Sequence, residues 1–241
     1  MFKNVVIKIS GEALQGDKAA GSGNYDSQTI DKLVSEIIEV IGKGVYVSLV
    51  VGGGNILRGR DAKPGMDRAN MDGIGMLATV MNGLYLSEAF RMKGAEAIVM
   101  TPFMVGSFTE LFDKRKAQAY LKKGSILIFA GGTGLPFFST DTIPVVRAAE
   151  LHADAVLFAK NVNGVYDDDP KKNPAAVKFD ALSYDEFISR NLNAIDMSAM
   201  DICRRQGITS VVFGLDEPKG IVRAIFGTDQ ELFQIGTKIT V

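Results

Sequence analysis

The sequence predicts a three-layer αβα sandwich of the α/β class, in which helices cover both faces of a mainly parallel sheet. Apolar, β-branched runs typical of buried strands alternate about seven times with segments of helical periodicity. Glycines gather where the strand-like runs end, at the edge where open α/β sheets bind ligands. No internal repeat or linker divides the chain, so we expect a single domain over residues 1–241.

The composition is that of an ordinary globular protein, with 46 % hydrophobic and 23 % charged residues. The net charge is −1 without long blocks of one sign, so nothing favours a nucleic acid or a membrane surface as partner. No apolar run approaches the ~20 residues that span a bilayer, and Lys8 and Glu12 interrupt any signal peptide. A single cysteine fits the reducing cytoplasm, and one cysteine with one histidine argues against a zinc site.

The first strand is predicted over Asn4–Ile9, and Ser10 and Gly11 follow it as a loop that an anion can approach. Lys8 breaks the apolar run one residue before its end. Its ammonium must therefore reach an anion or open water, the alternative being a lysine that snorkels from a strand terminus. After a glycine-rich loop, Asp26 or Ser27 is expected to cap a helix with an apolar face at Ile30, Leu33, Val34, Ile37, Ile38 and Ile41.

The second strand, over 45–51, stops abruptly at three glycines and Asn55. Without side chains, backbone N–H groups can approach an anion closely, and glycine tolerates the dihedral angles that this needs. The loop is therefore a phosphate-site candidate, with a tight strand-to-helix turn as the alternative. Arg58 follows it, and a guanidinium offers a fork of donors that matches phosphate oxygens.

Asp72 precedes a long predicted helix with apolar residues between Ile74 and Tyr85 on one face. Its carboxylate either caps that helix or accepts from a ligand hydroxyl, as acidic residues do with ribose in nucleotide sites. The residues alone favour the cap.

A third strand over 95–100 and a helix over 113–123 lead to the fourth strand, 125–130, which also ends in glycines at 131–134. The loop beyond contains Phe137 and Phe138. They either wedge the loop against the core, which is the default expectation, or line an apolar slot for a base. Thr140 or Asp141 is expected to cap the next helix.

The fifth strand, over 155–159, leads into a fourth glycine-bearing polar loop that begins at Lys160. Its three aspartates, 167–169, fit a solvated turn better than a cation site. Ser183 begins a helix with a capping box. Asp196 precedes a helix over Met197–Gln206, so it is either a cap or a functional carboxylate. A sixth strand over 210–213, a helix over 221–226 and a final strand over 237–241 complete the chain.

Four glycine-bearing loops thus follow strands whose carboxyl ends share one edge of a parallel sheet. Together they predict a trough for two phosphorylated ligands end to end, which is the geometry of phosphoryl transfer. Because the Walker and dinucleotide glycine patterns are absent, the residues indicate a phosphate-handling α/β enzyme of another kind. The candidate cations are Lys8, Arg58 and Lys160, and the carboxylates that could hold Mg²⁺ or orient the lysine are Asp141 and Asp196.

Seven short motifs run in order along nearly the whole chain. They are K-I-S-G-E-A-L at 8–14, G-G-G-N at 52–55, R-G at 58–59, M-D-R at 66–68, G-M-L-A-T-V-M-N at 75–82, G-T-G-L-P-F-F-S-T-D at 132–141 and N-G-V-Y-D-D-D-P at 163–170. Each is moderately specific, and the set closely resembles the bacterial-type uridylate (UMP) kinases of the amino acid kinase superfamily, which share an αβα sandwich.

The resemblance implies transfer of the γ-phosphoryl group of ATP to UMP, giving UDP and ADP for pyrimidine nucleotide biosynthesis. It also implies Mg²⁺ bound through nucleotide phosphates, a homohexamer, activation by GTP and inhibition by UTP. The alternatives are a carboxylate or carbamate kinase of the same superfamily and a non-catalytic nucleotide sensor.

By the same resemblance, Lys8 would neutralise the transferred phosphoryl group with Arg58 close by, and Asp141 and Asp196 would organise Lys8 and Mg²⁺. Asp72 would bind the ribose of UMP. The ATP site would comprise Lys8, Ile9, Ser10, Gly11, Gly54, Arg58, Asn161, Tyr166 and Asp169. The UMP site would comprise Gly53, Asp72, Thr133, Gly134, Leu135, Pro136, Phe137, Phe138, Ser139 and Thr140.

Three places depart from the family pattern. Residues 19–26 read AAGSGNYD where G-x-G-I-D is frequent, in the loop associated with the GTP response. Asn163 stands where an aspartate is common, and Ile143 and Pro144 replace small residues. Neither of these last two departures removes a proposed phosphate contact.

Overall fold

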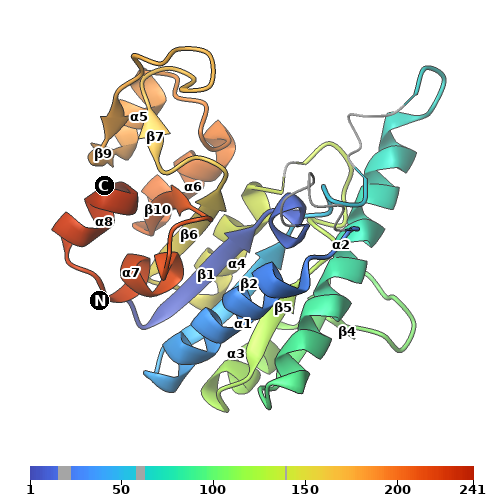
Figure 1. Cartoon of the computed structure of the whole chain (residues 1–241). Coiled ribbons are helices and arrows are strands. Elements are labelled where there is room, and N and C mark those ends of the chain that lie inside the picture. The colour runs from blue at the N-terminus through green and yellow to red at the C-terminus, as the bar shows by residue number, and fades with distance from the viewer. Residues whose placement is uncertain (16–22, 58–62, 139) are drawn as a thin grey trace.

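A nine-stranded sheet runs through the molecule in the order β4-β3-β5-β2-β1-β6-β10-β11-β9 (Figure 1). The computed structural model describes residues 1–15, 23–57, 63–138 and 140–241. The strands of this sheet are β1 (Asn4–Ile9), β2 (Tyr46–Val51), β3 (Ala97–Thr101), β4 (Glu110–Leu111), β5 (Ile126–Phe129), β6 (Ala155–Lys160), β9 (Ala181–Ser183), β10 (Thr209–Gly214) and β11 (Gly236–Thr240). A separate hairpin pairs β7 (Val165–Tyr166) with β8 (Lys178–Phe179).

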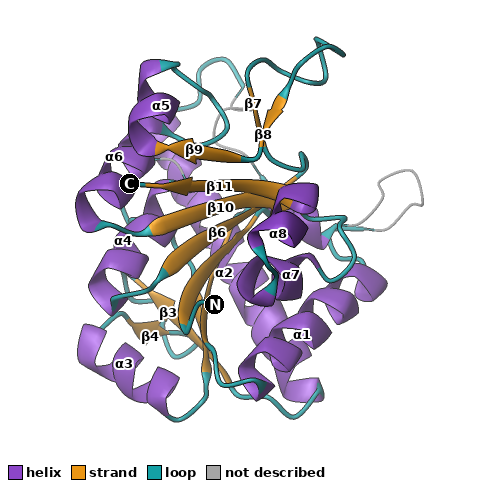
Figure 2. Cartoon of the chain, turned by 90° about the vertical axis from the view of Figure 1, so that its left-hand side faces the viewer, coloured by secondary structure: helices purple, strands orange, loops and turns teal. Residues whose placement is uncertain are grey.

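Helices cover both faces of the sheet, as the alternating pattern predicts (Figure 2). One face packs against α1 (Ser27–Gly42), α2 (Arg68–Met92), α7 (Gly220–Phe226) and α8 (Asp229–Ile235). The other face packs against α3 (Lys114–Lys122), α4 (Thr142–Leu151), α5 (Tyr184–Ser189) and α6 (Met197–Gln206). The 3₁₀ turn η1 (Gly11–Leu14) follows β1 directly.

The central strands are buried on both faces, and their side chains alternate between two cores. In β1, Val5, Ile7 and Ile9 face the core under α1, whereas Val6 faces the core under α4. Within the nine-stranded sheet, all strand pairs are parallel except β10 with β11, so β11 and β9 run against the rest of the sheet. The predicted mainly parallel sheet is therefore confirmed.

Apart from the start of α2, the predicted long strands and helices are present within a residue or two of the expected positions. Asp26 caps α1 by accepting the backbone N–H of Thr29, and Ser183 and Glu186 form the predicted capping box of α5. The elements missing from the prediction are short: β4, β7, β8, β9 and α8. They hold two to seven residues each, too few for periodicity to reveal them.

The cap assigned to Asp72 was wrong. Helix α2 begins at Arg68, and its cap is Asp67, which accepts the backbone N–H of Asn70 at 2.9 Å. Asp72 lies inside the helix, one turn beyond Arg68. Because the first turn of α2 carries no regular apolar spacing, the sequence pattern placed the helix start too late.

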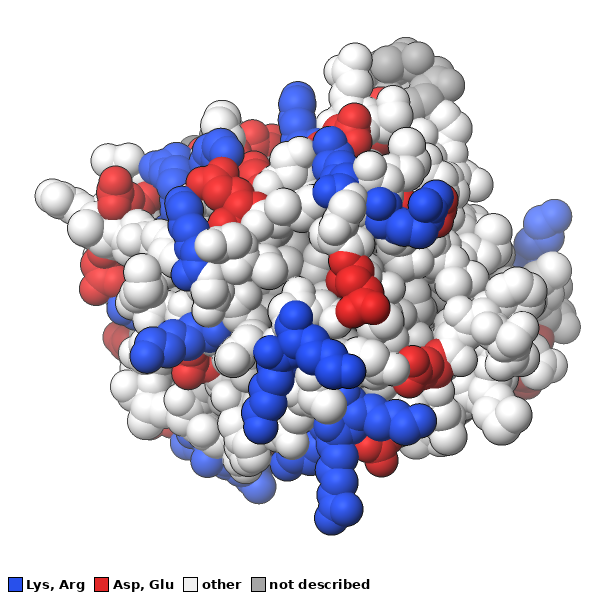
Figure 3. Space-filling model, turned by 90° about the horizontal axis from the view of Figure 1, so that it is seen from below, with Lys and Arg blue, Asp and Glu red and all other residues white. Residues whose placement is uncertain are grey.

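The face at which α1, α2 and α3 end carries Lys and Arg side chains interspersed with Asp and Glu (Figure 3). The residues that end these helices are Lys43, Lys93 and Lys123. Cations there are favourable because helix C-termini carry partial negative charge. Within the described residues, no helix has the length and apolarity that crossing a bilayer requires.

Candidate active site

The four loops predicted to share an edge do so. Strands β5, β2, β1 and β6 are neighbours in that order, and all four run parallel. Their carboxyl ends and one side of α2 surround a cavity of about 520 Å³. Residues of all four loops line it, including Gly11, Gly53, Thr133 and Lys160. The four loops thus line one shared cavity.

Two lysines converge on one carboxylate at the floor of this cavity. The Nζ atom of Lys8 lies 3.1 Å from Oδ1 of Asp141, and that of Lys160 lies 2.7 Å from Oδ2. Lys8 follows Val6 by two residues in β1, and Lys160 follows Phe158 by two in β6, so both project toward the α4 side of the sheet. Asp141 directly precedes α4 and meets them there.

Charge, rather than helix capping, explains the position of Asp141. Its side chain makes no capping hydrogen bond to α4, contrary to one of the two caps predicted. Burial opposes ionisation of the carboxyl, but Lys8 and Lys160 outweigh that cost and hold the pKa of Asp141 below its usual range. Burial lowers the pKa of Lys160, and the attraction of Asp141 offsets only part of that effect.

The glycine loops after β1 and β2 pack directly against each other. A Cβ atom on Gly11 would lie 2.5 Å from the backbone nitrogen of Gly54, and one on Gly54 would collide with the carboxylate of Glu12. A Cβ atom on Gly53 would lie 2.9 Å from the carbonyl oxygen of Gly75 in α2. Glycines 52–54 have no positive φ, so close approach rather than unusual dihedral angles requires them here.

Two polar side chains of α2 fix the glycine loops to that helix. Asn82, fully buried, donates to the carbonyl of Gly52 at 2.7 Å and to Oδ1 of Asn55 at 2.7 Å. Thr79 accepts the backbone N–H of Gly131 at 2.6 Å. These bonds connect the loops after β2 and β5, so α2 positions both sides of the cavity.

The loop after β5 is held against α2 from outside. Oδ2 of Asp72 accepts the backbone N–H of Phe137 at 3.0 Å, and Oδ1 pairs with Arg68 at 2.8 Å. Phe137 has a positive φ of 69°, and its side chain and that of Phe138 are 71 % and 58 % exposed. The expected wedge of both rings against the core is therefore wrong. Phe138 instead lines the cavity, as Leu135 and Thr140 do.

A second hollow adjoins the first at the end of β6. It has a volume of about 340 Å³, and Asn161, Asn163 and Tyr166 line it. Lys160 lines both hollows and therefore lies where they meet. Asp169 lies outside this second hollow and lines a neighbouring one together with Tyr166.

The carboxylate of Asp196 lies apart from the lysine pair. It precedes α6 without capping it, is exposed, and acts electrostatically on Lys160. Among the described residues, no three His, Cys, Asp or Glu side chains gather as a metal cluster.

The cavity residues missing from the site residues predicted from the sequence include Glu12, Arg68, Met76 and Thr79. Asn82, which holds the loop after β2 without lining the cavity, was missing too. All but Glu12 belong to α2, whose buried side faces the glycine loops. The signal was available in Thr79 and Asn82, because polar residues among apolar ones on a buried helix side are expected to find a polar partner. Two predicted site residues, Arg58 and Ser139, lie outside the described residues.

The model of the amino acid kinase family matches residues 3–214. The chain belongs to the amino acid kinase family. Uridylate kinases of two Streptococcus thermophilus strains are 44 % identical to this member over 241 residues, 99 % of this chain and 95 % of theirs. The resemblance seen in the motifs is thus confirmed.

Solved structures place this amino acid kinase among similar folds. A UMP kinase from Bacillus anthracis superposes with a TM-score of 0.92 at 36 % identity, covering 99 % of this chain and 96 % of that one. A UMP kinase from Ureaplasma parvum superposes with a TM-score of 0.89 at 34 % sequence identity, covering 100 % of both chains. A uridylate kinase from Archaeoglobus fulgidus superposes with a TM-score of 0.74 at 28 % sequence identity, covering 98 % of this chain and 99 % of that one.

Proposed function

We propose that this protein is a UMP kinase, which transfers the γ-phosphoryl group of ATP to UMP and forms UDP and ADP. The observation that carries the proposal is the pair of adjoining hollows that meet at Lys160 beside Lys8 and Asp141. Two phosphorylated ligands placed end to end would bring their phosphates together at these two cations. Similarity to uridylate kinases over nearly the whole chain selects UMP and ATP as those ligands.

The donor nucleotide is assigned to the second hollow and the loops beside it. Ser10, Gly11 and Gly54 would surround its phosphates with backbone N–H groups, next to Lys8. Asn161 and Tyr166 would contact the base and ribose. Asp169, on the far side of Tyr166, would contribute from the adjoining hollow. Ile9 and Arg58 complete this proposed site, Arg58 from outside the described residues.

The acceptor is assigned to the part of the first cavity between α2 and the loop after β5. Asp72 would bind the UMP ribose, and Gly53 would lie beside the acceptor phosphate. The exposed rings of Phe137 and Phe138 would be covered when uracil binds. The loop residues assigned to UMP are Thr133, Gly134, Leu135, Pro136, Phe137, Phe138, Ser139 and Thr140.

The chemistry asked of these residues is positioning and charge stabilisation. An ionised phosphate oxygen of UMP attacks the γ-phosphorus of ATP in line with the departing ADP oxygen, and no covalent enzyme intermediate is needed. Lys8 and Lys160 neutralise the negative charge on the transferred group. Asp141 holds the two ammoniums in place, so they are already oriented when charge develops.

Mg²⁺ fits the donor set of this site as an ion bound chiefly through nucleotide phosphates. Asp196 has an exposed carboxylate that acts electrostatically on Lys160, and Asp141 has one at the floor of the cavity. These two are the residues that would hold the ion. The chemistry that Mg²⁺ would supply there is neutralisation of the negative charge on the nucleotide phosphates.

Self-association to a homohexamer is also proposed, with a cytoplasmic location and with GTP as activator and UTP as inhibitor. Support for self-association comes from the side of α2 that faces away from the cavity. There Ile74, Leu77, Met81 and Tyr85 recur at helical spacing and are between 41 % and 55 % exposed. An apolar stripe of this kind is typical of a protein interface.

The deciding experiment measures ADP release from Mg-ATP with UMP, CMP, AMP and GMP as separate acceptors, each with and without GTP. Turnover confined largely to UMP supports the proposal, and the GTP samples reveal whether the altered loop at 19–26 retains an effector response. Tight ATP binding without turnover on any nucleotide would favour a sensor or a kinase of carboxylates.

A further inference from the structure

The β7–β8 hairpin, which carries Tyr166, makes backbone strand pairs only within itself. Val165 pairs with Phe179 and Tyr166 with Lys178. An isolated two-stranded hairpin is marginally stable in water, so other contacts must hold this one. The structure supplies them from the C-terminal part of the chain, which lies beyond residue 214, where the match to the family model ends.

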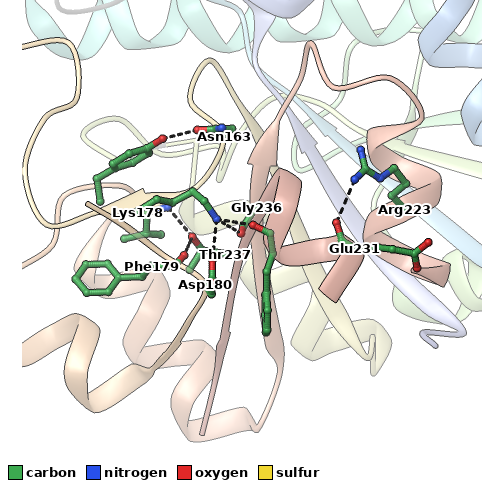
Figure 4. Close-up of polar contacts among 11 residues, drawn as sticks. Asn163, Lys178, Phe179, Asp180, Arg223, Glu231, Gly236 and Thr237 are labelled. Atoms are coloured by element: carbon green, nitrogen blue, oxygen red, sulfur yellow. Dashed lines mark hydrogen bonds and ion pairs between the residues drawn. The ribbon is translucent and has the colours of Figure 1, made fainter. Parts of the chain in front are cut away.

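One hydroxyl in β11 connects both strands of the hairpin to the main sheet. Thr237 is fully buried. Its Oγ1 accepts the backbone N–H of Val165 at 2.8 Å and donates to the carbonyl of Phe179 at 2.5 Å (Figure 4). A buried backbone group that loses its hydrogen-bond partner is destabilised by the full free energy of its desolvation. This hydroxyl therefore holds both strands of the hairpin against β11.

The ammonium of Lys178 makes a second connection, to the end of α8. It donates to the carbonyl oxygens of Phe233 at 2.6 Å and Gly236 at 3.0 Å, and it pairs with Asp180 at 3.2 Å (Figure 4). Carbonyls at a helix C-terminus lack partners within the helix and attract cations. Lys178 therefore anchors β8 to α8 with charge-assisted hydrogen bonds.

The start of β7 packs tightly against the two residues that hold the hairpin, Thr237 and Lys178, which we call the anchors. A Cβ atom on Gly164, whose φ is +149°, would lie 2.7 Å from Oγ1 of Thr237 and 2.9 Å from Cδ of Lys178. Beyond it, the hydroxyl of Tyr166 donates to Oδ1 of Asn163 at 2.5 Å, and both residues line the second hollow with Lys160. Thr237 and Lys178 thus determine the position of Asn163 and Tyr166, which form one wall of the second hollow.

We propose that Thr237 and Lys178 are positioning residues for the donor nucleotide, acting through the β7–β8 hairpin that carries Tyr166. The inference rests on the proposed function, because it assigns the second hollow to the base and ribose of ATP. Neither anchor lines that hollow, so their effect on ATP is indirect. The acceptor cavity, on the other side of Lys160, is left unchanged.

The test compares Thr237→Val, which keeps the shape but loses the hydroxyl, with Thr237→Ser, which keeps the hydroxyl. Thr237→Val is expected to raise the KM for ATP, and the calorimetric Kd for Mg-ATP, by about tenfold. The KM for UMP and kcat stay within about twofold of the unmodified protein, and Thr237→Ser restores ATP binding. Equal loss of ATP and UMP affinity, or no loss of either, overturns the inference.

Lys178→Met gives an independent arm should Thr237→Val fail to fold. Its matched control is Lys238→Met, because Lys238 connects β11 to α8 through Asp229 at 2.8 Å and is not itself part of the hairpin. Weaker ATP binding in Lys178→Met alone supports the inference, and the same loss in both variants contradicts it. If the unmodified protein binds Mg-ATP but does not phosphorylate UMP, the proposed function fails while the binding comparison still decides the inference.

Discussion

The carboxylate of Asp72 accepts the backbone N–H of Phe137 at 3.0 Å, although 65 positions separate the two residues. This bond holds the loop after β5 against α2, across the cavity assigned to UMP. The second oxygen of Asp72 pairs with Arg68, and together these contacts outweigh the effect of burial and lower the pKa of the carboxyl. Asp72 is therefore ionised at neutral pH and has one side toward the cavity.

Asp72→Asn is expected to raise the KM for UMP by about tenfold while the KM for ATP changes much less, because a charged acceptor beside the UMP ribose is lost. Steady-state kinetics with each substrate varied in turn measures the difference. Asp67→Ala is the matched control. It removes the true cap of α2 and costs about 1 kcal/mol of stability without touching the cavity. Equal changes in both KM values for Asp72→Asn would indicate a purely structural role.

Lys8→Met is expected to lower kcat on the order of 10²–10³-fold, the usual cost of removing one donor that stabilises charge in the transition state. Stability should change little by comparison, since Lys160 still pairs with Asp141. Lys3→Met, on an exposed residue just before the same strand, controls for losing a positive charge. Turnover close to normal in Lys8→Met would leave Lys8 as an ordinary lysine at a strand end.

Asp141→Asn is expected to destabilise the fold at pH 7 by about 3–5 kcal/mol, because the buried ammonium of Lys8 and the partly buried one of Lys160 lose their shared counter-charge. The folded-state pKa of Lys160, already lowered, falls further in the variant, and the unfolded chain then binds more protons. The variant should accordingly regain stability as the pH rises toward 10.5, the unfolded-state value. Urea unfolding at pH 7 and pH 9.5 measures this.

Unfolding at low pH tests the pairing of Asp141 with the two lysines in the unmodified protein. The pKa of Asp141 is lower folded than unfolded, so its contribution to stability is present above about pH 3.8 and is lost as the pH falls below that value. Asp141→Asn should lack this part of the acid transition. Asp185→Asn, which changes an exposed carboxylate, should keep it. Identical acid profiles for Asp141→Asn and the unmodified protein would contradict the assignment.

Leu77→Glu tests the proposed self-association through α2. A carboxylate in the middle of the exposed apolar stripe is expected to lower the molar mass in light scattering, because burying an unpaired charge is costly. Val177→Glu, on an exposed apolar residue away from α2, is the control. An unchanged mass for Leu77→Glu would place the interface elsewhere.

The elements that the sequence predicted well are those with strong, regular spacing. Strand β1 and helix α6 have the predicted bounds, and the adjacency of four strand ends followed from parallel pairing alone. The short hairpin β7–β8 was missed, because its position depends on Thr237 and on the carbonyl groups of Phe233 and Gly236, far away in sequence. The local sequence preferences of the hairpin residues carry no information about such distant partners.

The same distinction holds for the site. Lys8 and Asp141 were predicted to be site residues because they are charged and lie at a strand end and before a helix. The structure shows that they form an ion pair. The side chains that fix the loops, Thr79 and Asn82, lie mid-helix and act on backbone groups of other elements. The helix cap that the residues alone favoured for Asp72 was wrong, because the helix start at Arg68 shows no apolar periodicity.

The contact between Gly11 and Gly54 restricts how this enzyme can diversify. Neither glycine tolerates even a methyl group without displacing the other loop or Glu12, so single-step substitutions in the phosphate loops are disfavoured. A Cβ atom on Gly75, on the cavity side of α2, would meet nothing within 4 Å beyond its own stretch of helix. New acceptor preferences are therefore most accessible to natural or laboratory selection through α2, where a side chain can enter the hollow while the machinery that handles phosphate stays intact.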